Sequence, residues 1–135
     1  MSSELVLKSL IIPIDSKGEL FIQDRRGYKK PDWGFFGGSI EDGETPLSAV
    51  IRETKEELNI DVSEADLKYM GEFSIVHGEK NIERHLFLYK TDRANFTVSE
   101  GNGGIWMSRD EAEKHLDIDE RFERIIAAID NVVEY

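Results

Sequence analysis

The chain has 135 residues, 39% of them hydrophobic, which suffices for one domain over residues 1–135 with a buried core, and no stretch approaches the roughly 18 apolar residues of a membrane span. Its 17 basic and 28 acidic residues give a net charge of −11, a field that repels polyanions and argues against a duplex nucleic acid partner. The lack of cysteine excludes disulfides and thiolate sites, and the first residues lack a secretory pattern, so we expect a soluble cytoplasmic protein without a membrane partner.

The first part of the chain predicts short strands separated by polar turns. Apolar and β-branched residues bounded by turn-forming ones are typical of strands. In chain order we expect a strand at Leu5–Ile14, a turn at Asp15–Gly18, a hairpin partner at Glu19–Gln23, a basic loop at Arg25–Asp32 and an aromatic strand at Trp33–Phe36.

The clearest predicted helix follows. Thr45 is a good N-cap and Pro46 suits the first helical position. Asn59 can adopt the left-handed conformation that ends a helix. Helical spacing predicts that one side of this helix faces the core, through Leu47, Val50, Ile51, Thr54 and Leu58.

The rest of the chain mixes strands with two further helices. We expect strands at Leu67–His77, Ile82–Thr91 and Ile105–Met107, a short helix that Ser108 and Glu111 cap, and an amphipathic helix at Asp119–Val133. Strands and helices without regular alternation predict an α+β chain or an α/β/α sandwich.

Three carboxylates gather on one face of the first helix. A helix turns by about 100° per residue, so Glu53, Glu56 and Glu57 share a face, where like charges repel and the helix dipole disfavours anions. A hard cation such as Mg²⁺ would offset both effects, and the backbone at Gly37 and Gly38 could offer a carbonyl ligand. The alternative is an ordinary solvated face rich in glutamate.

The wider pattern resembles the Nudix box, a glycine, a glutamate and an Arg-Glu…Glu-Glu run at fixed spacing. The matching positions are Gly38, Glu44, Arg52, Glu53, Glu56, Glu57 and Ile60. Thr54 departs from an aliphatic position and Asn59 from a glycine, while Phe36 stands where many relatives have proline. Because the order of elements also matches along nearly the whole chain, the resemblance to MutT-type members implies a Nudix α/β/α sandwich with a mixed central sheet.

The resemblance implies a role for each matched residue. Glu53, Glu56 and Glu57 would be catalytic metal ligands for Mg²⁺, with Mn²⁺ as a possible substitute. Arg52 would orient Glu53, and Glu44 would brace the junction between loop and helix. In this family an acidic residue from a later loop often completes the metal site, and Glu100 is our candidate, with an ordinary exposed acid as the alternative.

Residues before the box could bind the substrate. Arg25, Arg26 and Lys30 belong to the densest basic cluster of the chain and could grip terminal phosphates, while Tyr28 could stack on a base; a solvated loop is the alternative. The histidines His77, His85 and His115 do not show the spacing of a metal site.

The substrate class follows by elimination. Family members selective for ADP-ribose tend to carry a proline one strand beyond the box, and the last proline here is Pro46. Members that act on dinucleoside polyphosphates tend to have a tyrosine nearby, and none lies between Tyr69 and Tyr89. The absence of both favours a nucleoside triphosphate, oxidised ones included. The leading hypothesis is cleavage to monophosphate and pyrophosphate, with an ADP-ribose or nucleoside diphosphate sugar hydrolase as alternative. A sensor that binds nucleotide without cleaving it is the alternative from another class. The expected partner is a small nucleotide, and the chain could be a monomer or a homodimer.

Overall fold

The computed structural model describes residues 4–27, 32–92, 96, 98, 102–116 and 122–132. Its strands are β1 (Glu4–Ile14), β2 (Leu20–Asp24), β3 (Trp33–Gly34), β4 (Phe36–Ser39), β5 (Leu67–Glu72), β6 (Ile75–His77), β7 (Lys80–Lys90) and β8 (Gly104–Met107). Its helices are α1 (Pro46–Leu58), α2 (Arg109–Leu116) and α3 (Phe122–Val132), and a short 3-10 turn covers Glu64–Asp66.

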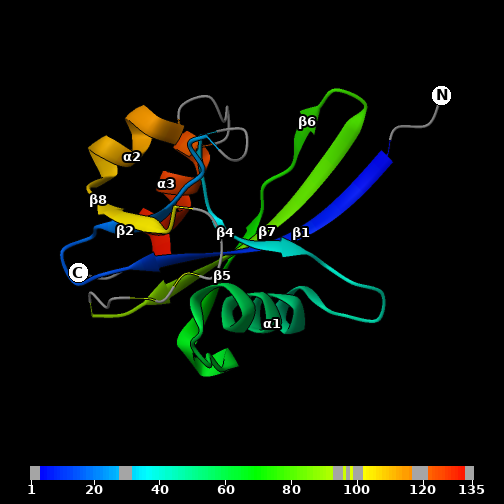
Figure 1. Ribbon diagram of the computed structural model, residues 1–135, viewed down its shortest axis with the longest axis horizontal. Helices are drawn as coiled ribbons and strands as arrows, with labels where there is room; N and C mark the ends of the chain where they lie inside the picture. Colours follow the sequence, from blue (N-terminus) through cyan, green and yellow to red (C-terminus); the bar gives the residue numbers. More distant parts are fainter. Residues whose placement is uncertain are drawn as a thin grey trace.

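All of these strands belong to one mixed sheet (Figure 1). The long strands β1 and β7 run parallel along their whole length, from the pair Glu4 and Lys80 to the pair Ile14 and Lys90. The other pairings are antiparallel: β5 and β6 flank β7, β2 and β4 flank β1, and β2 also pairs with β3 and β8.

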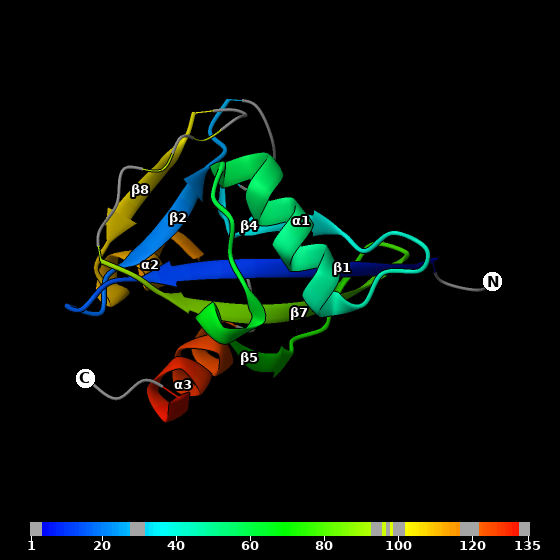
Figure 2. The ribbon, with the colours of Figure 1, turned by 90° about the horizontal axis from the view of Figure 1, so that it is seen from below.

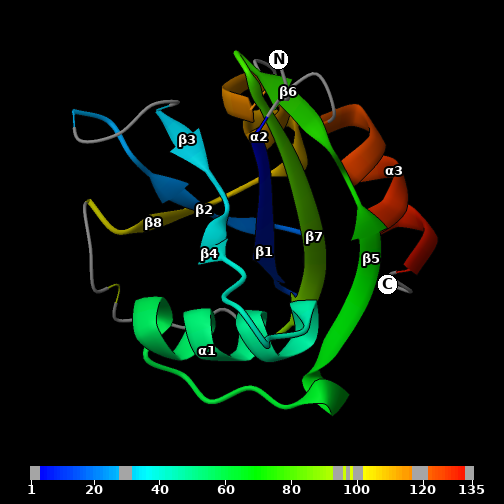
Figure 3. The ribbon, with the colours of Figure 1, turned by 90° about the vertical axis from the view of Figure 1, so that its right-hand side faces the viewer.

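The sheet carries a hydrophobic core on each face. Successive side chains of a strand point to opposite faces. On β1, Leu10, Ile12 and Ile14 therefore pack with residues of α2 and α3, whereas Ile11 packs with residues of α1. Figures 2 and 3 show α1 on the side of the sheet opposite to α3. This arrangement confirms the predicted α/β/α sandwich with a mixed central sheet. None of the helices in the described ranges has the length and apolar character needed to cross a bilayer.

Two predicted strands are each divided in the structure. The strand expected at Trp33–Phe36 is interrupted at Phe35, whose side chain is buried in the core beside α2 and α3. The strand expected at Leu67–His77 ends at Glu72, after a register shift between Tyr69 and Gly71, and β6 begins three residues later. In both cases a local irregularity of the sheet sets the boundary, and the pattern of residues along the chain does not predict such irregularities. Of the last predicted helix, residues 119–121 and 133 lie outside the described residues.

The ends of α1 are as predicted. The Thr45 hydroxyl accepts a hydrogen bond from the Ser48 backbone N–H at 3.0 Å, and the Thr45 N–H donates to the Ser48 hydroxyl at 2.9 Å. Asn59 ends the helix with φ 58° and ψ 34°, the left-handed conformation, and its N–H donates to the Lys55 carbonyl. These two caps fix where the helix starts and stops, and so which residues it presents to each side.

Thr54 is buried in α1, and among the described residues its hydroxyl has no hydrogen-bond partner. An unpaired buried hydroxyl costs free energy, while a methyl group of the same shape does not. We therefore expect Thr54→Val to raise the free energy of unfolding by about 1 kcal/mol, as measured by urea denaturation. The matched control, Thr45→Val, removes a bonded cap hydroxyl and should lower stability by about 1 kcal/mol. A Thr54→Val protein less stable than the wild type would contradict this explanation.

Candidate active site

The predicted site begins where β4 runs against α1. Gly37 has φ +138°, and a Cβ there would overlap the Ser9 carbonyl oxygen of β1. A Cβ on Gly38 would lie 2.5 Å from Oε1 of Glu53. Both positions therefore need glycine, the first for the close pairing of β4 with β1 and the second to leave room for a carboxylate.

The three predicted metal ligands differ in exposure and in their contacts. The Glu53 side chain is 13% exposed and lies against the backbone of Gly38. The carboxylate of Glu57 accepts a hydrogen bond of 3.0 Å from the Gly37 N–H. Glu56 is 57% exposed. The helix and the Gly37–Gly38 backbone thus enclose Glu53 and Glu57, with Glu56 at the rim.

Arg52 connects this helix face to the loop before it. Its Nε and Nη2 donate to the two carboxylate oxygens of Glu44, at 2.7 and 2.9 Å. Its Nη1 donates to Glu53 at 3.0 Å and to Glu56 at 3.2 Å, and Nη2 also donates to the Ser39 carbonyl at 3.1 Å. A two-pronged guanidinium–carboxylate pair fixes geometry strongly, so Arg52 holds two of the three glutamates in place.

The pair of Arg52 and Glu44 is electrostatically strong. The Arg52 hydrogen bonds, with the Glu41 N–H as a further donor, lower the pKa of Glu44 from its ordinary 4.5 to about 2. The same pair raises the pKa of Arg52, chiefly through the hydrogen bond to Glu44. Both groups are therefore charged at any pH near neutrality.

This shift predicts a change in acid stability. A carboxylate whose pKa is lowered by folding stabilises the fold above its unfolded pKa and loses that contribution as the pH falls through its folded pKa. For Glu44 the loss extends from about pH 4.5 down to about pH 2. We expect the melting temperature of wild type to exceed that of Glu44→Gln by a constant amount above pH 5, and the gap to shrink toward pH 2. A gap that stays constant through that range, in thermal melts, would show that the pair does not titrate in this way.

The helix face suits a hard divalent cation in the chemistry of its donors. Glu53, Glu56 and Glu57 offer carboxylate oxygens, the ligands that Mg²⁺ and Ca²⁺ prefer, and the backbone approaches closely at Gly38. Divalent metals are general in the family that this pattern indicates. Within the described residues, however, the three side chains whose ligand atoms all lie within 4.8 Å of one another are Glu72, Glu83 and His85, on β5 and β7. On α1, Arg52 and the Gly37 N–H hold the carboxylates instead.

The two arginines expected to bind substrate have internal partners. Arg25 donates from Nε to Gln23 at 2.7 Å and from Nη2 to the Phe35 carbonyl at 3.1 Å. Arg26 forms a two-pronged pair with Asp24 at 2.8 and 3.0 Å, lies 4.7 Å from the centre of the Trp33 ring, and is still 58% exposed. Arg26 thus faces solvent, whereas Arg25 braces β3 and β4. Tyr28, Lys30 and Glu100 lie outside the described residues.

Asp24 and Asn102 support this loop and were not singled out in the sequence. Asp24 is buried, and hydrogen bonds from Arg26 lower its pKa to about 2. The Asn102 side-chain amide donates to the Arg26 carbonyl at 2.6 Å. The contact of Asp24 with Arg26 had a signal in the sequence, an aspartate two residues before an arginine at a strand end. The contact of Asn102 with Arg26 joins residues 76 positions apart, and no local pattern predicts it.

The comparisons with known proteins agree with the geometry. The NUDIX domain family model matches residues 6–129. A curated relative, an 8-oxo-dGTP diphosphatase from Proteus vulgaris, is 40% identical over 55 residues, which are 39% of this chain and 49% of that protein, so the match spans about half of the relative's length.

Solved structures share the fold. A MutT protein from Methanosarcina mazei has a TM-score of 0.73 at 21% identity, covering 92% of this chain and 96% of that one. A MutT structure from work on Aliivibrio salmonicida and Vibrio cholerae has a TM-score of 0.71 at 24% identity, covering 92% and 98%. An Ap4A hydrolase from C. elegans has a TM-score of 0.64 at 21% identity, covering 89% and 98%. Because the family model spans nearly all of it, the chain belongs to the NUDIX domain family, and its fold is similar to that of MutT structures.

Proposed function

We propose that the protein is a pyrophosphohydrolase that uses Mg²⁺, or Mn²⁺ in its place, to cleave a nucleoside triphosphate, oxidised nucleotides included, into the monophosphate and pyrophosphate. The observation that carries the proposal is the face of α1, where Glu53 and Glu57 lie against a backbone that only glycine allows to come so close, with Glu56 at the rim. In an ordinary solvated surface helix, no glutamate would have to lie as close to a neighbouring backbone as Glu53 lies to Gly38.

The reaction consumes one water molecule. Its oxygen bonds to a phosphorus atom, the bond from that phosphorus to the bridging oxygen breaks, and one proton leaves to solvent or to a base. Glu53, Glu56 and Glu57 would hold the cation, with the carbonyl of Gly37 or Gly38 as a further ligand. The cation, when bound, supplies positive charge to the phosphates and acidifies bound water.

The chain's own residues would set the positions. Arg52 orients the Glu53 carboxylate through a hydrogen bond of 3.0 Å from Nη1, and Glu44 holds Arg52 in place by accepting two hydrogen bonds from it. The Gly37 N–H fixes Glu57. Side chains held in advance need not reorganise during the reaction, which is how electrostatic stabilisation of a transition state becomes effective. Of the three carboxylates we propose Glu53 to accept the proton from water, because Arg52 orients it directly and its side chain is 13% exposed, against 57% for Glu56.

The substrate class rests on the relative and on the sequence. The curated relative is named as an 8-oxo-dGTP diphosphatase, which supports a triphosphate with an oxidised base. The solved neighbours support the fold alone. The sequence gives further support, because beyond the box it lacks the proline typical of family members selective for ADP-ribose and the tyrosine typical of those that act on dinucleoside polyphosphates.

A panel of nucleotides tests this proposal. The purified protein is incubated with Mg²⁺ and normal or oxidised nucleoside triphosphates, ADP-ribose or a nucleoside diphosphate sugar, and the products are separated by ion-exchange chromatography. We expect monophosphate and pyrophosphate from a triphosphate, at a higher kcat/KM than for the other substrates. Preference for ADP-ribose or a sugar nucleotide would move the protein to that class, and tight binding without turnover would make it a nucleotide sensor.

Arg26 is the described residue that we propose for phosphate binding. It is more than half exposed, at the start of the basic loop, and an exposed contact of this kind contributes to ground-state binding. Arg26→Ala should raise KM for the triphosphate severalfold, with a smaller change in kcat, and the effect should fade as salt rises. Arg124→Ala, which removes one exposed charge from α3, is the matched control. Equal KM values in the two variants would remove Arg26 from the binding site.

A further inference from the structure

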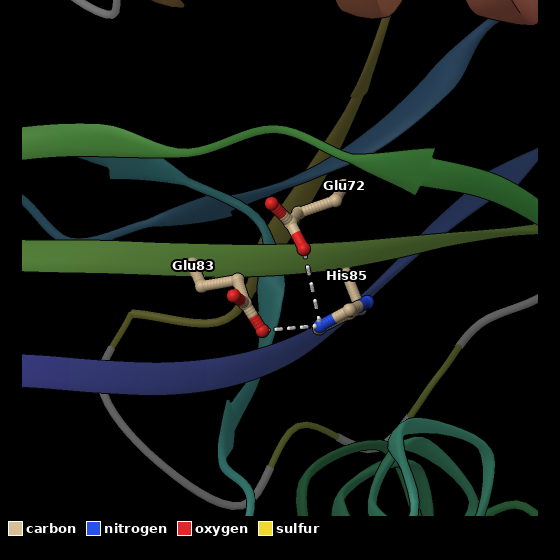
Figure 4. Close-up of side chains that lie close together, drawn as sticks. All are labelled: Glu72, Glu83 and His85. Atoms are coloured by element: carbon tan, nitrogen blue, oxygen red, sulfur yellow. Dashed lines mark hydrogen bonds and ion pairs between the residues drawn. The ribbon is translucent and has the colours of Figure 1, made fainter.

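Two carboxylates converge on one imidazole at a place outside α1. Glu83 and His85 are alternate residues of β7 and therefore share a face of the sheet, and Glu72 of β5 is the cross-strand partner of His85. Nε2 of His85 lies 2.9 Å from a carboxylate oxygen of Glu83 and 4.0 Å from one of Glu72 (Figure 4). The side chain of His85 is 13% exposed, so this nitrogen is mostly shielded from bulk water.

These separations suit the ligands of one small ion. Zinc bonds of about 2.0–2.1 Å to nitrogen and oxygen at tetrahedral angles place two ligand atoms about 3.3 Å apart. The two distances from Nε2, 2.9 and 4.0 Å, bracket that value, and all three ligand atoms lie within 4.8 Å of one another. Rotations of the glutamate side chains, 30% and 48% exposed, can close the remaining gap without backbone movement.

Tyr69 fixes the other nitrogen of the same ring. Its hydroxyl lies 2.8 Å from Nδ1 of His85. If Nδ1 carries the ring proton and donates it to Tyr69, the lone pair of Nε2 faces the two carboxylates. A histidine that binds a metal usually has its second nitrogen held in this way.

The charge of the cluster is incompletely balanced. Among the described residues, neither Glu72 nor Glu83 forms an ion pair with a lysine or arginine; Glu72 accepts one hydrogen bond from the Ser74 hydroxyl. Two carboxylates and one imidazole therefore carry a net negative charge even when the histidine is protonated. A divalent cation would balance both carboxylates and replace the ring proton between Nε2 and Glu83.

We propose that Glu72, Glu83 and His85 form a second metal site, for a divalent cation of the zinc class, distinct from the carboxylates of α1. The imidazole selects this class, because Mg²⁺ prefers an all-oxygen octahedral shell while zinc accepts nitrogen and oxygen. A cavity of about 480 Å³, lined by Tyr69 and His85 and by Leu47 near the start of α1, borders the cluster. Among the three proposed ligands His85 lines this cavity, so an ion can reach the cluster from that side and water can supply the fourth ligand.

Zinc binding in excess magnesium tests the proposal. The protein is stripped of metal, saturated with Mg²⁺ so that the α1 carboxylates are occupied, and titrated with ZnCl₂ in a calorimeter. We expect one equivalent of zinc to bind to the wild type. His85→Gln and Glu83→Gln should weaken it by at least about tenfold, and Tyr69→Phe by about tenfold, since loss of a supporting hydrogen bond costs 10–100-fold.

Three controls make the result decisive. His115→Gln changes a histidine that lies 3.7 Å from one carboxylate, Glu111, outside the cluster, and should bind zinc as the wild type does. Glu56→Gln should also retain the zinc, because it alters only the α1 face. Thermal melts without metal confirm that each variant folds. Zinc binding that is absent from the wild type, unchanged in folded His85→Gln and Glu83→Gln, or lost in Glu56→Gln would overturn the proposal.

Discussion

Glu57→Gln is expected to lower kcat for triphosphate hydrolysis by roughly 10²–10³-fold or more, with little change in stability. In the wild type the Gly37 N–H donates to the Glu57 carboxylate at 3.0 Å, and glutamine keeps an oxygen that can accept this hydrogen bond. The substitution removes the negative charge that would bind the cation. Glu56→Gln should act in the same direction. Since like charges on one helix face repel, removing one should leave α1 no less stable.

Steady-state kinetics and thermal melts together check this expectation. Glu113→Gln, which removes an exposed carboxylate from α2, is the matched control and should keep both kcat and melting temperature. A Glu57→Gln protein with the kcat of the control would show that this face of α1 is not the active site. A variant that loses activity only because it unfolds would be recognised by its melt.

The second large effect is expected from Gly38→Ala. The added methyl would lie 2.5 Å from Oε1 of Glu53, too close for the carboxylate to stay where Arg52 holds it. Because Gly38 has no positive φ and the obstructing atom is the end of a side chain, the fold should tolerate the alanine while Glu53 moves. We expect kcat to fall by roughly 10²-fold, as misplacement of about 1 Å can cause, with a melting temperature near that of wild type.

Two neighbours serve as controls for Gly38→Ala. Ser39→Ala, at an exposed position of β4, keeps the backbone carbonyl that accepts from Arg52 and should retain activity. Gly37→Ala should instead destabilise the fold, because its Cβ would meet backbone atoms of β1 and its φ is positive. Wild-type kcat in Gly38→Ala would mean that the position of Glu53 seen here is not needed for the reaction.

The features that could be predicted best from the sequence are those that interactions between residues close in the chain determine. The bounds of α1 follow from Thr45, Pro46 and Asn59, and its carboxylate face from helical spacing, so both could be predicted from a short segment. The sandwich also followed, because the order of strands and helices restricts the possible layers. The hydrogen bond from Arg25 to the Phe35 carbonyl and the contact of Arg26 with the Trp33 ring could not be predicted, because both depend on how distant strands lie beside each other.

The cluster at His85 shows the same limit on a larger scale. The spacing of the histidines in the chain gives no sign of a metal site. Glu72 reaches His85 only because β5 pairs antiparallel with β7 and shifts register between Tyr69 and Gly71. That shift is a property of the paired strands, and a residue pattern within either strand does not reveal it.

The dependence of triphosphate hydrolysis on divalent cation tests the central claim most directly. Wild-type protein is assayed for pyrophosphate release with Mg²⁺, then with a chelator in excess over all metal, and then with Mg²⁺ restored. Because the carboxylates of α1 would act through the cation, we predict that activity disappears in chelator and returns in full with Mg²⁺. Undiminished pyrophosphate release in excess chelator would contradict the account.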